Sequence, residues 1–212
     1  MGITVQEKFW ESEFGKDYTE RNNYTDPAVL DTFYTEQWGV TRTAMNQEFL
    51  NGLSLGPILE VGCNVGNQLN MLQSQGHTSL YGIELQPYAV ERAKALTHDL
   101  NIIQGSAFDL PFKDNYFDVV FTAGVLIHIN PVDLPKAMAE MYRVSKKYIW
   151  GFEYFSSEVT AINYRDNTDK LWKADYAKLF QAQFPDLKLV KQKEYPYTTG
   201  TNVDVMYLLE KS

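Results

Sequence analysis

The chain has 212 residues, of which 44% are hydrophobic, and 19 basic against 27 acidic residues give it a net charge of −8. This length suits one domain with a core of ample size. No run of Lys or Arg is longer than the pair Lys146 and Lys147. The chain therefore lacks a basic face that would neutralise phosphates, which excludes nucleic acid as an expected partner.

A single cysteine, Cys63, cannot form an internal disulfide, which is consistent with a reducing compartment. No stretch approaches the roughly 18 apolar residues of a membrane span. Residues 1–10 also lack the basic start and apolar centre of a signal peptide. We therefore expect a cytoplasmic protein with no membrane partner, and the sequence does not determine its oligomeric state.

Residues 1–50 precede the first predicted strand and are rich in aromatic side chains. These are Phe9, Trp10, Phe14, Tyr18, Tyr24, Phe33, Tyr34 and Trp38. So many aromatic residues outside the main sheet suit either a helical cap over a ligand site or a layer packed on the sheet edge. We divide the chain into an N-terminal helical cap segment, 1–50, and a main domain, 51–212.

The first predicted strand, 58–61, leads directly into a turn that carries Gly62 and Gly66. The next apolar strand, Ser79–Glu84, ends on an acid. Glycines let the backbone pass close to a ligand, and such an acid can accept hydrogen bonds from both ribose hydroxyls, so the pairing predicts a nucleoside site. A dinucleotide site would carry G-x-G-x-x-G. Because Asn64 occupies the place of the second glycine, a pyrophosphate ligand is disfavoured.

Further along the chain, amphipathic helices alternate with apolar strands. The predicted helices run from 69 to 76, from 87 to 96, from 130 to 144 and over Trp172–Phe184, and the predicted strands are Asn101–Gln104, Tyr116–Phe121, Tyr148–Phe152, Leu187–Glu194 and Val203–Glu210. A turn at Gly200 separates the last two strands. This order predicts an α/β fold with a doubly wound, mostly parallel, Rossmann-like sheet of seven strands that ends in an antiparallel hairpin.

Several segments in this register resemble class I S-adenosylmethionine-dependent methyltransferases. The resemblance covers roughly residues 50–155 and is carried by Glu60–Asn67, in the pattern E-x-G-C-x-x-G-N, by Glu84, by Gly105–Phe112 and by Phe117–Val120. Further segments resemble one family in particular, the methylases associated with pseudaminic acid biosynthesis. These segments are Phe9–Trp10, Glu13–Gly15, Tyr18, Arg21–Asn22, Gly124–Pro131, Tyr164–Arg165, Asp169–Leu171 and Pro185–Val190. That family is named for its place in surface-glycan pathways, so it implies polysaccharide biosynthesis without naming a substrate.

The resemblance implies S-adenosylmethionine as the cofactor and 51–212 as a methyltransferase domain. The turn after the first strand would border the methionine half, and Glu84 would hold the ribose. Ser106 stands where many class I members carry an acid for the adenine amino group, so Leu85 and Phe108 would hold adenine by apolar contacts. The implied cofactor contacts are Tyr18, Arg21, Glu60, Gly62, Cys63, Asn64, Gly66, Asn67, Glu84, Leu85, Ser106, Ala107, Phe108, Thr122, Ala123 and Gly124.

Methyl transfer from a sulfonium is an in-line displacement, so the protein mainly positions the acceptor, and a base matters for a hydroxyl or an ammonium. His128 is the candidate base because it follows the fourth strand at the carboxyl edge of the sheet; a capping or packing role is the alternative. The candidate acceptor-binding residues are His128, Glu153, Tyr154, Tyr164 and Arg165. Arg165 could grip a carboxylate or phosphate. No clustered His and acid pattern occurs, so we expect no metal.

The predicted function is methylation of an oxygen or nitrogen of a small metabolite, such as a sugar or amino-acid derivative. A protein that binds S-adenosylmethionine without turnover, as a partner or sensor, is a second hypothesis. A nicotinamide-dependent oxidoreductase is a third, and it is disfavoured by Asn64 and by the acid, Glu60, ahead of the glycines.

Overall fold

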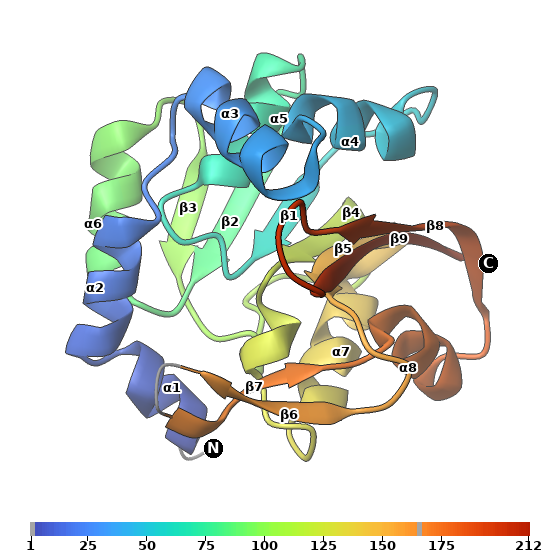
Figure 1. Ribbon diagram of the computed structural model, residues 1–212. Coiled ribbons are helices and arrows are strands. Elements are labelled where there is room, and N and C mark those ends of the chain that lie inside the picture. The colour runs from blue at the N-terminus through green and yellow to red at the C-terminus, as the bar shows by residue number, and fades with distance from the viewer. Residues whose placement is uncertain (1–2, 165–166) are drawn as a thin grey trace.

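A computed structural model describes residues 3–164 and 167–212 as an α/β structure in which helices cover both faces of a central sheet (Figure 1). The helices are α1 (Val5–Trp10), α2 (Glu13–Arg21), α3 (Pro27–Trp38), α4 (Arg42–Leu50), α5 (Asn67–Ser74), α6 (Pro87–Leu96), α7 (Leu134–Val144) and α8 (Tyr176–Gln183), with a 3-10 turn, η1 (Leu126–His128). The strands are β1 (Ile58–Val61), β2 (Leu80–Glu84), β3 (Asn101–Gln104), β4 (Phe117–Ala123), β5 (Ser145–Tyr154), β6 (Thr160–Tyr164), β7 (Asn167–Lys173), β8 (Leu187–Pro196) and β9 (Val203–Lys211). Across these two ranges every helix is too short or too polar for a membrane span.

The main sheet has the strand order β3-β2-β1-β4-β5-β9-β8. Strands β1 to β5 run parallel, and β9 is antiparallel to both of its neighbours. This confirms the predicted doubly wound sheet and its antiparallel C-terminal hairpin. The strand order reverses between β1 and β4, and ligands bind beyond the carboxyl ends of the strands at such a switch point.

Each face of the sheet has its own apolar core because successive residues of a strand point to opposite faces. In β1, Ile58 packs on the side of α3 to α6, whereas Leu59 packs on the side of α7 and α8. In β5, Trp150 and Ile149 divide in the same way, and all four side chains are fully buried. Burial on both faces explains why these strands are nearly continuous apolar runs in the sequence.

The aromatic N-terminal segment divides into two parts. Helices α3 and α4 lie beside α5 and contribute Tyr34 and Phe49 to the core on that face. Helices α1 and α2 form the other part, and α2 lies alongside α6 (Figure 1). The Gln86 side chain fixes them there, because its Nε2 donates hydrogen bonds to the carbonyl oxygens of Trp10 and Ser12, at 3.1 and 3.3 Å.

The region after β5 differs from the prediction. The sequence predicts a helix over Trp172–Phe184, but Trp172 lies in β7, and α8 begins at Tyr176 after the Asp175 side chain caps the N–H of Lys178 at 3.1 Å. Strand β7 pairs with β6 in a separate antiparallel hairpin that the sequence does not predict. The error arises because a short apolar run before a helix fits both periodicities.

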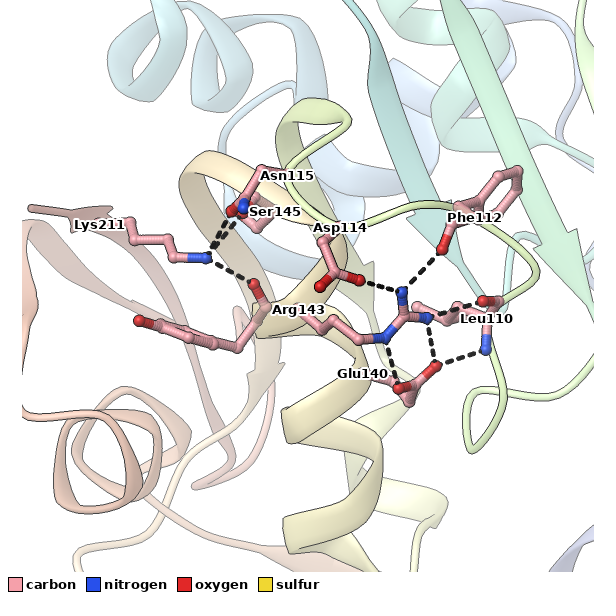
Figure 2. A network of polar contacts seen from close by, with 9 residues as sticks. Leu110, Phe112, Asp114, Asn115, Glu140, Arg143, Ser145 and Lys211 are labelled. Atoms are coloured by element: carbon pink, nitrogen blue, oxygen red, sulfur yellow. Dashed lines mark hydrogen bonds and ion pairs between the residues drawn. The ribbon is translucent and has the colours of Figure 1, made fainter.

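A polar network fixes the loop between β3 and β4 to the end of α7 (Figure 2). The Arg143 guanidinium donates to the carbonyl oxygens of Leu110 and Phe112, at 2.8 and 2.7 Å. It also pairs with the carboxylates of Glu140 and Asp114, at 2.7 and 2.8 Å. Hydrogen bonding to Arg143 lowers the pKa of Glu140, which in turn accepts the Leu110 N–H at 2.8 Å. The loop is thereby held in place where it enters the central strand β4.

Candidate active site

A cavity of about 500 Å³ lies beyond the carboxyl ends of the parallel strands. Residues that follow β1, β2 and β4 line it, together with the start of the β3–β4 loop. Helices α1 and α2 contribute Trp10 and Tyr18, α3 contributes Tyr34, and the β6–β7 hairpin contributes Tyr164 and Leu171. The tertiary structure therefore encloses one site with segments from both ends of the chain.

The turn after β1 requires glycine at one position for two separate reasons. Gly62 has a φ of 75°, in the left-handed region that favours glycine. A Cβ at this position would also lie 2.7 and 2.8 Å from the two Cγ atoms of Val125. Asn64 and Gly66 continue the turn at φ values of 48° and 83°. This conformation brings the backbone of 62–64 to the cavity and starts α5.

Asn67 ties the N-terminal segment to this turn. Its Nδ2 donates to the Asn22 carbonyl oxygen at 2.7 Å, and its Oδ1 accepts the Tyr24 N–H at 3.0 Å. Both polar atoms of its amide thus bind the chain that follows α2. Asn67 lines the cavity, and the geometry gives its amide a role in closing the site over the turn.

Glu84 links the ends of β2 and β1. Its Oε2 accepts the Asn64 N–H and its Oε1 accepts the Gln86 N–H, each at 2.8 Å. Burial raises the pKa of Glu84, and these backbone hydrogen bonds partly offset the rise. Each oxygen can still accept a further hydrogen bond, so the carboxylate is rigidly placed beside the glycine turn with capacity for two donors such as ribose hydroxyls.

Glu60 and Arg42 are two buried ionisable residues near the turn. Glu60 is 2% exposed, and burial raises its pKa well above the ordinary value, while the nearby Arg42 lowers it. Arg42 is fully buried and donates to Asn46 Oδ1 and Tyr34 Oη, at 2.8 and 3.1 Å. Its guanidinium also lies over the rings of Tyr34, Trp150 and Phe152, at 5.1 to 5.4 Å from the centroids.

Three buried acceptor oxygens in this part of the site lack a hydrogen-bond partner among the described residues. They are Glu60 Oε2, Asn64 Oδ1 and Gln68 Oε1, and all three residues line the cavity. Buried polar atoms are rarely left unpaired in a protein. A ligand that brings an ammonium group and a nucleoside would supply donors to them, so the residues present fit the S-adenosylmethionine that the sequence implies.

A second carboxylate reaches the segment expected to flank adenine. Glu7 of α1 accepts a hydrogen bond from Ser106 Oγ at its Oε1, at 2.6 Å. Its Oε2 accepts the Thr4 N–H at 2.7 Å, which completes a capping box at the start of α1. Ser106 and Glu7 both line the cavity. The acid missing at position 106 is thus replaced in space by one from 99 residues earlier in the chain.

His128 lies at the end of η1, inside an aromatic wall. Its Nδ1 is 2.9 Å from the Lys170 carbonyl oxygen. Because a carbonyl can only accept, Nδ1 carries the hydrogen, which leaves Nε2 unprotonated in the neutral ring. Burial lowers the pKa of His128 to about 4. The ring contacts Trp10 and Tyr164, with centroids at 4.5 and 5.3 Å, so Nε2 can accept a proton or a hydrogen bond within the site.

The opposite end of the cavity combines aromatic rings with one acid. We call it the aromatic box, and it comprises Tyr34, Trp38, Phe152, Tyr154, Tyr197 and Asp204. Asp204 is 2% exposed, and burial raises its pKa to about 7. It comes from β9, opposite Tyr154 of β5 in the antiparallel pair.

The structure brings most residues of the sequence-predicted site to the cavity. Those that line it are Tyr18, Glu60, Gly62, Cys63, Asn64, Asn67, Glu84, Leu85, Ser106, Ala107, Phe108, Ala123, Gly124, His128, Tyr154 and Tyr164. Arg165 lies outside the described residues. Among residues 3–164 and 167–212, no three His, Cys, Asp or Glu side chains gather as metal ligands.

Four predicted contacts do not reach the lining. Arg21 is exposed at the end of α2, Gly66 precedes α5, and Thr122 is fully buried in β4. Glu153 is also buried, and its carboxylate accepts the N–H groups of 125–127 at 3.1 to 3.4 Å, so it caps η1. Burial raises the pKa of Glu153 to about 7. The geometry gives Glu153 the role of positioning the turn that carries His128.

Sequence reasoning missed Glu7, Trp10, Tyr34, Trp38 and Asp204 as lining residues. The aromatic members belong to the segment predicted as a cap, but their order gives no indication of which rings face inward. A usable signal existed for Asp204, because an acid in the otherwise apolar run 203–209 is costly to bury without a function. No comparable signal marks Glu7, whose contact with Ser106 joins residues 99 positions apart in the sequence.

Comparison with known families identifies residues 59–148 as a methyltransferase domain. An uncharacterized methyltransferase of Synechocystis sp. is 31% identical over 100 residues, which cover 46% of this chain and 47% of that protein. The sterol 24-C-methyltransferase of Pneumocystis carinii is 30% identical over 118 residues, which cover 53% of this chain and 30% of that protein. The chain thus matches about half or less of the length of these curated relatives.

Among solved structures, the Burkholderia thailandensis 1,6-didemethyltoxoflavin-N1-methyltransferase, with S-adenosylhomocysteine bound, has a TM-score of 0.69 at 16% identity and covers 100% of this chain and 92% of its own. A Leishmania major S-adenosylmethionine-dependent methyltransferase has a TM-score of 0.72 at 15% identity, covering 97% of this chain and 86% of its own. Residues 59–148 therefore match a methyltransferase domain, and the chain has the class I methyltransferase fold.

Proposed function

We propose that this chain transfers a methyl group from S-adenosylmethionine to an oxygen or nitrogen of a small metabolite. The observation that carries the proposal is the rigid pairing of Glu84 with the turn at Gly62 and Asn64, bordered by unpaired acceptor oxygens. The cofactor supplies a methyl group activated by its sulfonium. The chain's own residues bind, orient and exclude water.

In this proposal each part of the cavity has a separate task. Glu84 accepts the ribose hydroxyls, and Glu60, Asn64 and Gln68 supply acceptors for the amino end of the cofactor. His128 receives a proton, or orients the acceptor, at Nε2. The neutral ring suits this task because its Nδ1 hydrogen is held by the Lys170 carbonyl oxygen.

For the acceptor, the resemblance to methylases of pseudaminic acid biosynthesis supports a sugar or amino-acid derivative of a surface-glycan pathway. Tyr154 and Tyr164 would border it from β5 and β6. The curated relatives include sterol methyltransferases, which act on a far more apolar acceptor. The buried carboxyl of Asp204 favours a polar one. A protein that binds the cofactor without turnover stays the alternative, and the neutral His128 ring in the cavity lining argues against it.

The first experiment is calorimetric titration of the purified chain with S-adenosylhomocysteine, with NAD as the control. We expect saturable binding in the micromolar range for the former and none for the latter. Absence of S-adenosylhomocysteine binding would contradict the proposal. Binding without any methylated product from sugar, amino-acid and nucleotide-sugar acceptors would favour the alternative.

We also propose that Glu7 recognises the adenine amino group in place of the acid that Ser106 lacks. Glu7→Gln is expected to weaken S-adenosylhomocysteine binding by about 1 to 3 kcal/mol, the usual range for a hydrogen bond to a charged group. The same substitution should weaken the binding of S-inosylhomocysteine far less, because that ligand has no adenine amino group. Calorimetry on both ligands measures the difference, and Glu11→Gln, on an exposed side chain of the same region, is the matched control. Equal losses for the two ligands would assign Glu7 a purely structural role.

A further inference from the structure

We propose that the aromatic box binds a protonated amine, or another organic cation, carried by the methyl acceptor. The inference rests on the proposed function and names the chemical class of its acceptor. Asp204 would provide the counter-charge, and the rings of Trp38 and Tyr197 would provide aromatic faces for the cation.

The hydrogen bonds of Asp204 and the nearby Lys173 offset only part of the cost of burying its charge. Its Oδ2 accepts from Tyr197 Oη at 3.2 Å, and its Oδ1 accepts from Asn202 Nδ2 at 3.4 Å. The ion pairs among the described residues do not include Asp204. Lys173 donates to Asn202 Oδ1, so Asn202 stands between its ammonium and the carboxyl. A buried carboxylate is costly unless it is paired, and a ligand cation would pair it.

The rings around Asp204 pack against one another, with Trp38 edge to face on Phe152 and Tyr197 and tilted against Tyr34. Trp38 lies 5.2 Å from Tyr197 and 5.3 Å from Phe152 between ring centroids, and 4.6 Å from Tyr34. Among residues 3–164 and 167–212, Trp38 Nε1 makes no hydrogen bond of ordinary geometry, but Trp38 is close enough to Asp204 to lower the pKa of that carboxyl. Aromatic faces attract organic cations, and the attraction is largest where water is excluded. Rings alone would suit an apolar acceptor equally well, so the buried carboxyl is the feature that selects a positive charge.

The cofactor's own sulfonium is a second positive charge that could occupy the aromatic box. The strand order argues against this, because it places the box far from Glu84. Glu84 ends β2, whereas Asp204 lies on β9, which is four strands away across β1, β4 and β5. At about 4.8 Å per strand, this separation is roughly 19 Å. A sulfonium is joined to the ribose through a single carbon, so a ribose held at Glu84 leaves the sulfonium far from Asp204. The acceptor is the better occupant of the box.

The charge on Asp204 depends on several groups that surround it. Its pKa is raised to about 7, with burial as the largest cause; the charge of Glu153 also raises it, and the Tyr197 hydroxyl and Lys173 lower it. Tyr154 faces it from β5. A bound cation favours the carboxylate, so binding should release a proton below about pH 7 and strengthen as the pH rises through that value.

The test uses the chain saturated with S-adenosylhomocysteine and titrates it with n-butylammonium chloride or with n-butanol, its neutral counterpart. We expect the ammonium to bind and the alcohol not to bind. Binding is measured by nuclear magnetic resonance or calorimetry. Asp204→Asn should lower ammonium affinity on the order of tenfold and leave S-adenosylhomocysteine affinity unchanged. Asp99→Asn, on an exposed loop, is the matched control. Equal affinity for the two probes, or for the wild type and Asp204→Asn, would overturn the inference.

Stability provides a second readout. Since the pKa of Asp204 is raised above its unfolded value, the folded state binds more protons at this group between about pH 4 and pH 7, and the contribution of Asp204 to stability falls as the pH rises through that window. Asp204→Asn removes the cost of burying a carboxylate. Its melting temperature should therefore exceed that of the wild type near pH 8, and the difference should be smaller near pH 5. A lower melting temperature at both pH values would identify a structural carboxylate and contradict a binding role.

A further variant tests the rings without touching the carboxyl. Trp38→Leu should weaken n-butylammonium binding roughly two- to thirtyfold, the range of cation–π energies, while S-adenosylhomocysteine still binds. Unchanged ammonium binding in this variant would remove the rings from the inference. Loss of S-adenosylhomocysteine binding by the wild type is a separate result, which would overturn the proposed function itself.

Discussion

The His128→Ala variant is expected to lose about 10²-fold in turnover and to bind S-adenosylhomocysteine with nearly unchanged affinity. The reason is the fixed tautomer: the Lys170 carbonyl oxygen holds the hydrogen on Nδ1, so Nε2 is the ring atom available to an acceptor. Turnover is measured with the acceptor that the screen identifies, and affinity by calorimetry. Activity equal to the wild type would assign His128 to packing.

The His128→Asn variant distinguishes the role of Nδ1 from the role of Nε2. Its amide nitrogen can replace Nδ1 and keep the hydrogen bond to Lys170, but it offers nothing at the position of Nε2. We expect this variant to be as slow as His128→Ala if Nε2 acts on the acceptor. If the histidine only anchors the β6–β7 hairpin, His128→Asn should retain activity. His98→Ala, on an exposed side chain, is the control.

The pH dependence follows from the burial of His128. Its pKa of about 4 lies below the ordinary value, so the ring is neutral at pH 7 and becomes protonated only in acid. Turnover at saturating acceptor should therefore stay level down to about pH 5 and fall toward pH 4. Nitrogen-15 NMR of labelled histidine can measure the same pKa without an acceptor, and an ordinary value near 6.5 would contradict the burial argument.

Glu84→Ala is expected to weaken S-adenosylhomocysteine binding by about 1 to 3 kcal/mol, the usual range for hydrogen bonds to a charged group. Two effects combine, because the carboxylate would hold the ribose and also accepts the N–H groups of Asn64 and Gln86. Calorimetry measures the affinity and thermal unfolding measures the stability. An unchanged dissociation constant would remove Glu84 from the cofactor site.

Glu84→Gln distinguishes these effects. The amide keeps the shape of the side chain, but its NH2 group faces a backbone N–H and cannot accept from it. We expect an intermediate loss of affinity, with a smaller change in stability than in Glu84→Ala. Glu91→Ala serves as the control, since its side chain is 72% exposed on α6. Weakened binding in the control would point to a general effect of lost negative charge.

The sequence alone was sufficient to predict the class I fold. The first strand, predicted over 58–61, matches β1 residue for residue, because a strand buried on both faces leaves a nearly continuous apolar run before the turn residues. The glycine turn and Glu84 were also predictable, because both meet requirements that act within a single segment. The conformation of Gly62 and the acid at the end of β2 are local requirements that a single segment satisfies. The helix predicted over Trp172–Phe184 was wrong at its start because pairing with β6, a nonlocal event, decided the state of Trp172.

What the sequence determined, then, was local: the order of strands and helices, the turn that follows β1 and the acid after β2. Only the tertiary structure decided which distant side chains meet. It placed Glu7 against Ser106, and it turned Glu153 inward to cap η1. It also grouped Asp204 with the rings of the aromatic box. Such contacts depend on packing between elements, and the periodicity of a segment records which of its faces is buried but not which partner covers it.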